Sequence, residues 1–97
     1  MTTMTTKVIF RKWPNGDIIA LFPELPGTND PYTCLSYEHY GQHGAASTDL
    51  PNTVLAKPRE YEELRRELVS IGYDDLKVCT RFTRKDITTR RKEINRE

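Results

Sequence analysis

The chain has no long hydrophobic run and no secretory signal. Its longest uninterrupted apolar run is Ile18–Phe22, whereas a membrane-spanning helix requires roughly 20 apolar residues. The N-terminal segment Met-Thr-Thr-Met-Thr-Thr-Lys lacks the apolar core of a signal peptide. We therefore expect a cytoplasmic protein that has no membrane partner.

Cysteines are also scarce, and the two that are present lie far apart in the sequence. In a protein without an export signal, Cys34 and Cys79 are predicted to be reduced thiols rather than a disulfide. The chain carries no complete catalytic or cofactor signature and no internal repeat. The sequence consequently predicts no cofactor.

What the chain does contain fits one small domain. Its 97 residues are 36% hydrophobic and 30% charged, which is typical of a soluble domain with a modest core. Because such a core gives little stability, we expect that a homo-oligomer would help to stabilise it. The net charge is +1, but residues 81–97 hold seven Lys or Arg against three acids, whereas residues 1–80 hold eight against eleven. We expect an acidic body with a basic tail.

The N-terminal part of the chain predicts three strands. Residues 7–13 and 18–22 are rich in β-branched and aromatic types, and Asn15-Gly16 between them is typical of a tight hairpin turn. The second strand is apolar on both faces, so we expect it inside the sheet. A third, more polar strand is predicted over residues 32–40.

The C-terminal part contains one clear helix. Residues 41–58 show no period and predict a long loop, after which Pro58 begins a helix with Gly72 placed as its C-terminal cap. The apolar stripe of this helix is Tyr61, Leu64, Leu68 and Ile71. A fourth strand over residues 76–82 completes the prediction.

These elements predict an α+β domain over residues 7–82. We expect a small, mainly antiparallel sheet of order β-β-β-α-β with one helix packed on it. Residues 1–6 are expected to be a flexible N-terminus. Residues 83–97 form the basic C-terminal tail, which is either disordered or a helix that needs a partner.

Several short motifs run through residues 7–82: Lys7-Val-Ile-Phe-Arg-Lys, Gly16-Asp-Ile-Ile-Ala-Leu-Phe-Pro-Glu24, Cys34-x-Ser-Tyr-x-His39-x-Gly-Gln-His-Gly-Ala-Ala46, Ala56-Lys-Pro, Glu60-Tyr-x-x-Leu and Ile71-Gly-Tyr. On these motifs the chain resembles a family of small uncharacterised proteins found in bacteria, plasmids and bacteriophages, to which no biochemical activity is assigned. The resemblance implies a mobile-element context. Short proteins of that context are often inhibitors of host defence, so it implies a non-enzymatic binding protein that occludes a host protein or sequesters a small anionic ligand.

The stretch from Cys34 to Ser47 is the candidate recognition segment, because it gathers both histidines with a cysteine, tyrosines and hydroxyls. Its small residues allow backbone amides to approach a ligand, while Gln, His and Ser side chains offer polar contacts. A tryptophan at the hairpin end would anchor a partner protein or close the edge of the core. We predict binding residues Tyr37, His39, Gln42, His43, Gly44, Ser47 and Trp13.

Two alternatives use the same stretch. Cys34 with His39 or His43 would form the nucleophile of a small hydrolase, because a nearby imidazolium lowers the pKa of a thiol. The same three residues would bind zinc, with Cys79 as a fourth ligand if the third and fourth strands pair. Against both, a cysteine within a strand is commonly a small buried hydrophobe.

A third function, that of a nucleic-acid-binding accessory protein, would use the basic tail. The acidic body and the lack of interleaved aromatic residues oppose it, and terminal charge runs are commonly only solvated. The candidate contacts are Arg81, Arg84, Lys85, Arg90, Arg91 and Lys92.

Overall fold

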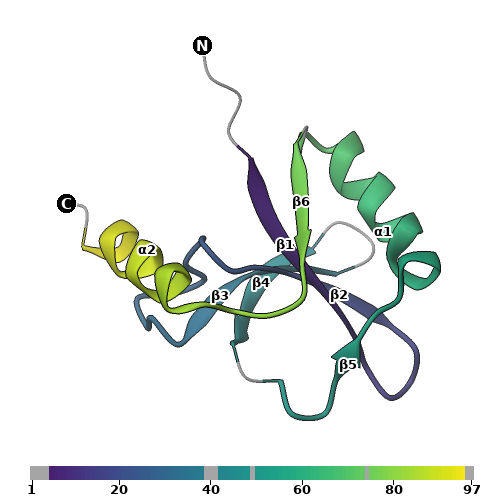
Figure 1. The fold of residues 1–97 in the computed structure, drawn as a ribbon, viewed down its shortest axis with the longest axis horizontal. Helices are drawn as coiled ribbons and strands as arrows, with labels where there is room; N and C mark the ends of the chain where they lie inside the picture. The colour runs from purple at the N-terminus through teal and green to yellow at the C-terminus, as the bar shows by residue number, and fades with distance from the viewer. Residues whose placement is uncertain (1–4, 39–41, 49, 74, 96–97) are drawn as a thin grey trace.

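The computed structural model describes residues 5–38, 42–48, 50–73 and 75–95, which form one sheet and two helices (Figure 1). The strands are β1 (Thr6–Lys12), β2 (Ile18–Phe22), β3 (Thr33–Glu38), β4 (Gln42–Ser47), β5 (Val54–Leu55) and β6 (Leu76–Cys79), and the helices are α1 (Pro58–Ser70) and α2 (Arg84–Ile94). The predicted α+β class is confirmed. Neither of these helices is long and apolar enough to cross a membrane.

The sheet is built around β1 and β2. The strand order is β4-β3-β2-β1-β5, and β6 pairs with the same strand β1. Among the described strands, β6 runs parallel to β1 and the other pairings are antiparallel, so the sheet is mainly antiparallel as predicted. Both outer strands on the β1 side are short, and they pair with different parts of β1. Ile9 lies opposite Cys79 of β6, and Lys12 lies opposite Val54 of β5.

Strand β2 is buried along its whole length, as its sequence predicts, because both faces of the sheet are covered. On the first face, α1 lies over the sheet through Leu64 and Leu68. Residues of this cluster are Val8, Phe10, Ile18, Ala20, Phe22, Tyr37, Leu64 and Leu68. On the second face, a smaller cluster of Ile9, Ile19, Leu21 and Cys34 is covered in part by Trp13, Leu50 and Phe82.

Three details of the prediction are wrong. Residues 41–58 do not form one long loop, because β4 pairs with β3 over its whole length and β5 pairs with the end of β1. The last strand ends at Cys79, and Phe82 instead packs on the second face of the sheet. In the stripe of α1, Ile71 is 48% exposed, and Tyr73 packs on the first face by stacking on Phe22 at a ring distance of 4.9 Å.

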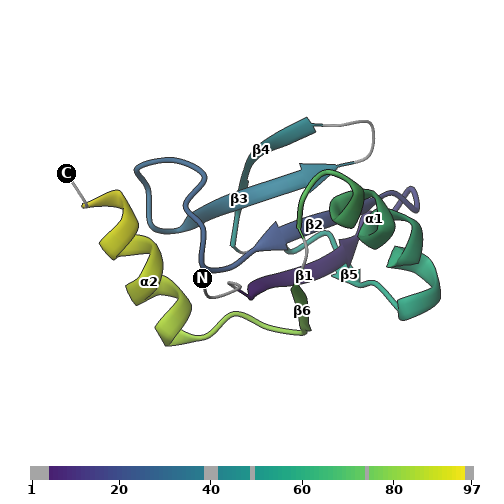
Figure 2. The ribbon, with the colours of Figure 1, turned by 90° about the horizontal axis from the view of Figure 1, so that it is seen from above.

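The basic tail, for which the sequence left disorder or a partner-dependent helix open, forms α2, and this helix is anchored to the body by polar side chains. Thr83 caps its N-terminus by accepting a hydrogen bond from the Asp86 amide. The buried Asp86 carboxylate accepts a hydrogen bond of 3.2 Å from Lys7 on β1, and this bond raises the pKa of Lys7. In two perpendicular views α2 and α1 lie at opposite ends of the molecule (Figure 1, Figure 2).

Arg90 lies one turn further along α2 and is fully buried. Its Nε donates 3.0 Å to the Pro31 carbonyl, and its Nη1 donates to the Pro23 carbonyl. Its guanidinium carbon also lies 5.7 Å from the centre of the Phe82 ring. Since Pro23 follows β2 and Pro31 precedes β3, Arg90 ties α2 to both ends of the β2–β3 connection.

Candidate binding surface

Strand β3 separates the predicted site residues between the two faces of the sheet, because alternate side chains of a strand point to opposite faces. Cys34 belongs to the second-face cluster and Tyr37 to the first-face cluster. On β4, His43 lies opposite Tyr37 and therefore shares its face, whereas Ala46 lies opposite Cys34. The structure does not bring Cys34 and His43 together.

This separation removes the geometry that the hydrolase and zinc hypotheses require of Cys34 and His43. Cys79 is on β6, which pairs with β1 and not with β3, so the condition for a fourth ligand is not met. Among the described residues, no group of three or more His, Cys, Asp or Glu side chains could hold a metal ion. His39 and the side chain of Gln42 lie outside the described part of the chain.

His43 belongs to a small polar cluster over the end of α1, which we call the His43 cluster and define as His43, Tyr37, Tyr73 and Glu67. The His43 ring packs edge-on against Tyr37 at 4.8 Å, and its Nε2 is hydrogen-bonded to the Tyr73 hydroxyl at 2.9 Å. The Tyr37 hydroxyl donates to the Glu67 carboxylate. Burial raises the pKa of Tyr73, which is the opposite of what a nucleophilic phenolate requires. The cluster therefore holds the His43 ring in place through Tyr37 and Tyr73.

Cys34 is a buried hydrophobe rather than a reactive thiol. Burial raises its pKa to about 11, although the nearby charge of Arg90 acts in the opposite direction. The folded pKa thus lies above the ordinary value of 9.0, so the neutral thiol favours the folded state. The stability that the folded state gains from this difference in pKa is present below about pH 9 and is lost as the pH rises towards 11.

We expect the two cysteines to differ sharply in alkylation. In the folded protein at about pH 8, iodoacetamide should modify Cys79, which is half-buried, and leave Cys34 unmodified, because only about one in a thousand Cys34 thiols is ionised and none is accessible. Intact mass spectrometry should show one adduct per native chain and two after unfolding. The control variant Cys79→Ser should show none in the native state, and rapid modification of Cys34 would contradict this assignment.

The remaining predicted residues lie on the outer strand β4 and at the β1–β2 hairpin turn. His43, Gly44 and Ser47 are exposed on β4, which is the first strand in the sheet order. Trp13 is half-buried against the second-face cluster at the hairpin turn, where Gly16 adopts a φ of +94°. We predict from the sequence that Trp13 either anchors a partner protein or closes the edge of the core. The observed packing corresponds to the second of these roles.

The main-chain groups of β4 alternate between β3 and the open edge. The Thr48 amide donates 3.0 Å to the Tyr32 carbonyl, whereas the Leu35 amide turns away from β4 and donates 2.9 Å to Leu25. Leu35 lies opposite Ala45, so this pair is not hydrogen-bonded. The N–H and C=O groups of Ala45, and by the same alternation those of His43, point away from β3.

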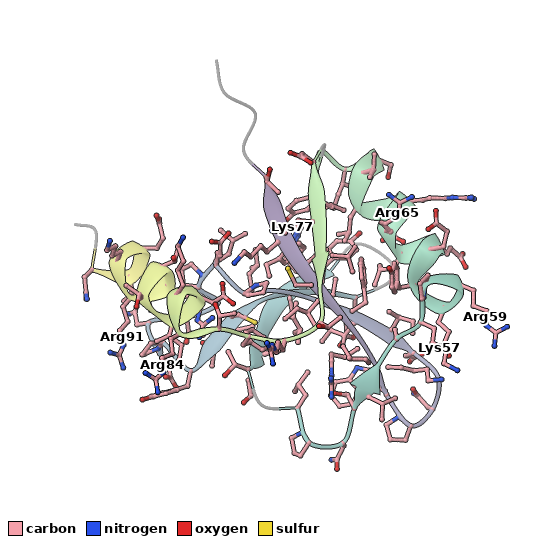
Figure 3. All side chains as sticks on the ribbon, viewed as in Figure 1. Lys57, Arg59, Arg65, Lys77, Arg84 and Arg91 are labelled. Atoms are coloured by element: carbon pink, nitrogen blue, oxygen red, sulfur yellow. The ribbon has the colours of Figure 1, made fainter. Side chains whose placement is uncertain are left out.

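The six tail residues are not equivalent. Arg81, Arg84, Lys85, Arg91 and Lys92 are exposed, and Arg84 and Arg91 extend from α2 in Figure 3. Arg90 is buried and hydrogen-bonded to two carbonyls, so its assignment as a nucleic-acid contact is corrected. Of the six candidate contacts, Arg90 is therefore buried in the molecule and the other five remain on its surface.

Sequence reasoning missed a cavity on the second face, which we call the Arg11 pocket. It has a volume of about 240 Å³ and is lined by Ile9, Arg11, Leu21, Thr48, Leu50, Pro51, Thr80, Arg81 and Phe82. Its residues come from four separate segments, so no local motif marks it. The one available signal was Arg11, a charged residue on the otherwise apolar inner pattern of the first strand.

Comparisons of the chain with protein-family models, with curated proteins and with solved structures give no match. The fold and the placed residues therefore define a class only, that of a small α+β protein whose mainly antiparallel sheet ends in an exposed outer strand.

Proposed function

We propose that this chain is a non-enzymatic binding protein of a mobile genetic element that inhibits host defence by occluding a host protein. In this proposal an extended segment of the target adds to the sheet alongside β4. The mobile-element context rests on the resemblance of residues 7–82 to the bacterial, plasmid and bacteriophage family. The mode of binding rests on β4 itself.

The open edge of β4 carries the argument. Native proteins commonly protect an outer strand with Lys, Pro, a bulge or very short length. β4 has six residues, Gln-His-Gly-Ala-Ala-Ser, with neither Lys nor Pro. The opposite edge is different, because β5 has two residues and β6 carries the exposed Lys77 (Figure 3). An added strand gains affinity from main-chain hydrogen bonds and specificity from neighbouring side chains, for which His43 and the His43 cluster are available.

The variant Ala45→Pro tests strand addition directly. Proline removes the outward N–H of Ala45 without removing a hydrogen bond to β3, and proline is tolerated on outer strands. We expect complex formation with the host target to weaken at least about tenfold, since one hydrogen bond is lost and the proline ring blocks close approach of the added strand. The measurement is co-purification from bacterial lysate followed by quantitative mass spectrometry and gel filtration.

The matched control is Val54→Ala, which changes an exposed side chain on the opposite edge. A target retained by the wild type and by Val54→Ala but lost by Ala45→Pro, with unchanged circular dichroism, supports the proposal. Equal retention by Ala45→Pro would refute strand addition at β4. A dimer of the wild-type chain that Ala45→Pro abolishes would show that a second copy, not a host protein, occupies the edge.

A further inference from the structure

The Arg11 pocket has an apolar floor beneath a cationic rim. Ile9 and Leu21 of the central strands are each 1% exposed and form the floor. Leu50, Pro51 and Phe82 contribute apolar walls from two connecting segments. The pocket has a volume of about 240 Å³. A molecule with one aromatic or aliphatic body fits this space.

Arg11 is held in place before any ligand arrives. Its Nε donates 3.0 Å to the Thr53 hydroxyl and its Nη2 donates 2.7 Å to the Thr53 carbonyl. Thr53 is itself buried, and its hydroxyl donates 2.8 Å to the Leu50 carbonyl. A guanidinium has five N–H donors. Two are used in these bonds, so three remain without an acceptor within the described part of the chain.

The charged side chains among the described lining residues are both cationic. Arg81 is exposed at the pocket and the hydroxyls of Thr48 and Thr80 line it, whereas none of the described lining residues is acidic. Two guanidinium groups with open donors favour a carboxylate or a phosphate, which accept charge-assisted hydrogen bonds. The apolar floor favours a ligand whose uncharged part is buried at the same time.

We propose that the Arg11 pocket binds a small organic anion, with its carboxylate or phosphate between Arg11 and Arg81 and its apolar body over Ile9 and Leu21 against Phe82. The site is distinct from the outer strand β4 and from the predicted segment 34–47. It gives a location to the binding of a small anionic ligand that the sequence resemblance implies. It does not depend on the host-protein proposal, because strand addition uses the outward groups of Ala45.

The test is an NMR titration of the full-length ¹⁵N-labelled chain with four probes. Phenyl phosphate and benzoate each combine an aromatic body with an anion, whereas inorganic phosphate has no body and phenol has no charge at neutral pH. We expect phenyl phosphate or benzoate to shift the amides of Thr48, Thr80 and Phe82 selectively, with at least about tenfold tighter binding than inorganic phosphate or phenol. Whichever of phenyl phosphate and benzoate binds with the higher affinity shows whether the pocket prefers a phosphate or a carboxylate.

The variant Arg81→Gln tests the rim, because Arg81 is exposed and its removal leaves the core intact. Binding of phenyl phosphate or benzoate should weaken about five- to tenfold. Arg59→Gln, an exposed arginine on α1 (Figure 3), is the matched control and should bind as the wild type does, as should Ala45→Pro. Absence of localised shifts up to about 10 mM probe, equal binding of phenol, or unchanged binding by Arg81→Gln would each overturn the proposal.

Discussion

Replacing Arg90 with methionine is expected to lower the free energy of unfolding by about 2–3 kcal/mol and to release α2 from the sheet. The substitution leaves the carbonyls of Pro23 and Pro31 without their buried donors, and an unsatisfied buried polar group costs about 1–3 kcal/mol. The loss is partly offset because Arg90 Nη2 is itself buried without an acceptor in the described structure. The expected net effect is a large share of the roughly 5–15 kcal/mol that stabilises a domain.

Chemical denaturation measures the global effect of Arg90→Met, and amide hydrogen exchange over residues 84–94 measures the release of α2. The matched control is Arg91→Met, which changes the neighbouring exposed arginine and should alter stability by no more than about 0.5 kcal/mol. If the two variants had equal stabilities, Arg90 would not anchor the helix.

The second large effect is expected at Gly27, where the β2–β3 connection lies against β3 and β4. A Cβ at this position would lie 2.6 Å from the Ala45 Cβ and 2.6 Å from the Cys34 carbonyl oxygen. Neither contact is at the flexible end of a side chain, so the connection or the β3–β4 pair must move. We expect Gly27→Ala to destabilise the protein by about 1–3 kcal/mol, as overpacking of a close contact does.

Gly44 provides the internal comparison for Gly27. Its added Cβ would meet only the Ser36 hydroxyl oxygen, at 3.5 Å, which is an ordinary contact. Gly44→Ala should therefore be neutral or slightly stabilising, because alanine loses less conformational freedom than glycine in a strand. Thermal unfolding of the two variants side by side checks the difference, and equal melting temperatures would disprove the close packing at Gly27.

The sequence predicted the parts of the fold that depend on local patterns. The β1–β2 hairpin follows from Asn15-Gly16 between apolar runs, and α1 follows from Pro58 and the spacing of Leu64 and Leu68. Strand β4 was missed because its small residues have low strand propensity. It is a strand because it pairs with β3, and this pairing is not visible in the local sequence. Helix α2 gave no amphipathic signal because the residues it buries are Asp86 and Arg90, and burial of charged side chains has no hydrophobic period.

The candidate site was predictable only in part for a similar reason. Alternation along β3 correctly places Cys34 and Tyr37 on opposite faces. Which face His43 joins depends on its register opposite Tyr37, and no local pattern in the sequence specifies this register. The Arg11 pocket depends on residues that come together only when β6 joins β1 and when Thr48, Leu50 and Pro51 lie against the sheet.

The parallel pair of β1 and β6 has a consequence for synthesis of the protein. Strands β1 to β4 are consecutive in the chain and can pair as they emerge from the ribosome. Strand β1 must wait for residues 76–79 before β6 covers that part of its outer edge, and closing so long a segment is slow relative to forming hairpins. A nascent chain that has emerged only as far as the segment between β4 and α1 therefore presents two uncovered strand edges, those of β1 and β4. We expect this species to be the one most exposed to aggregation.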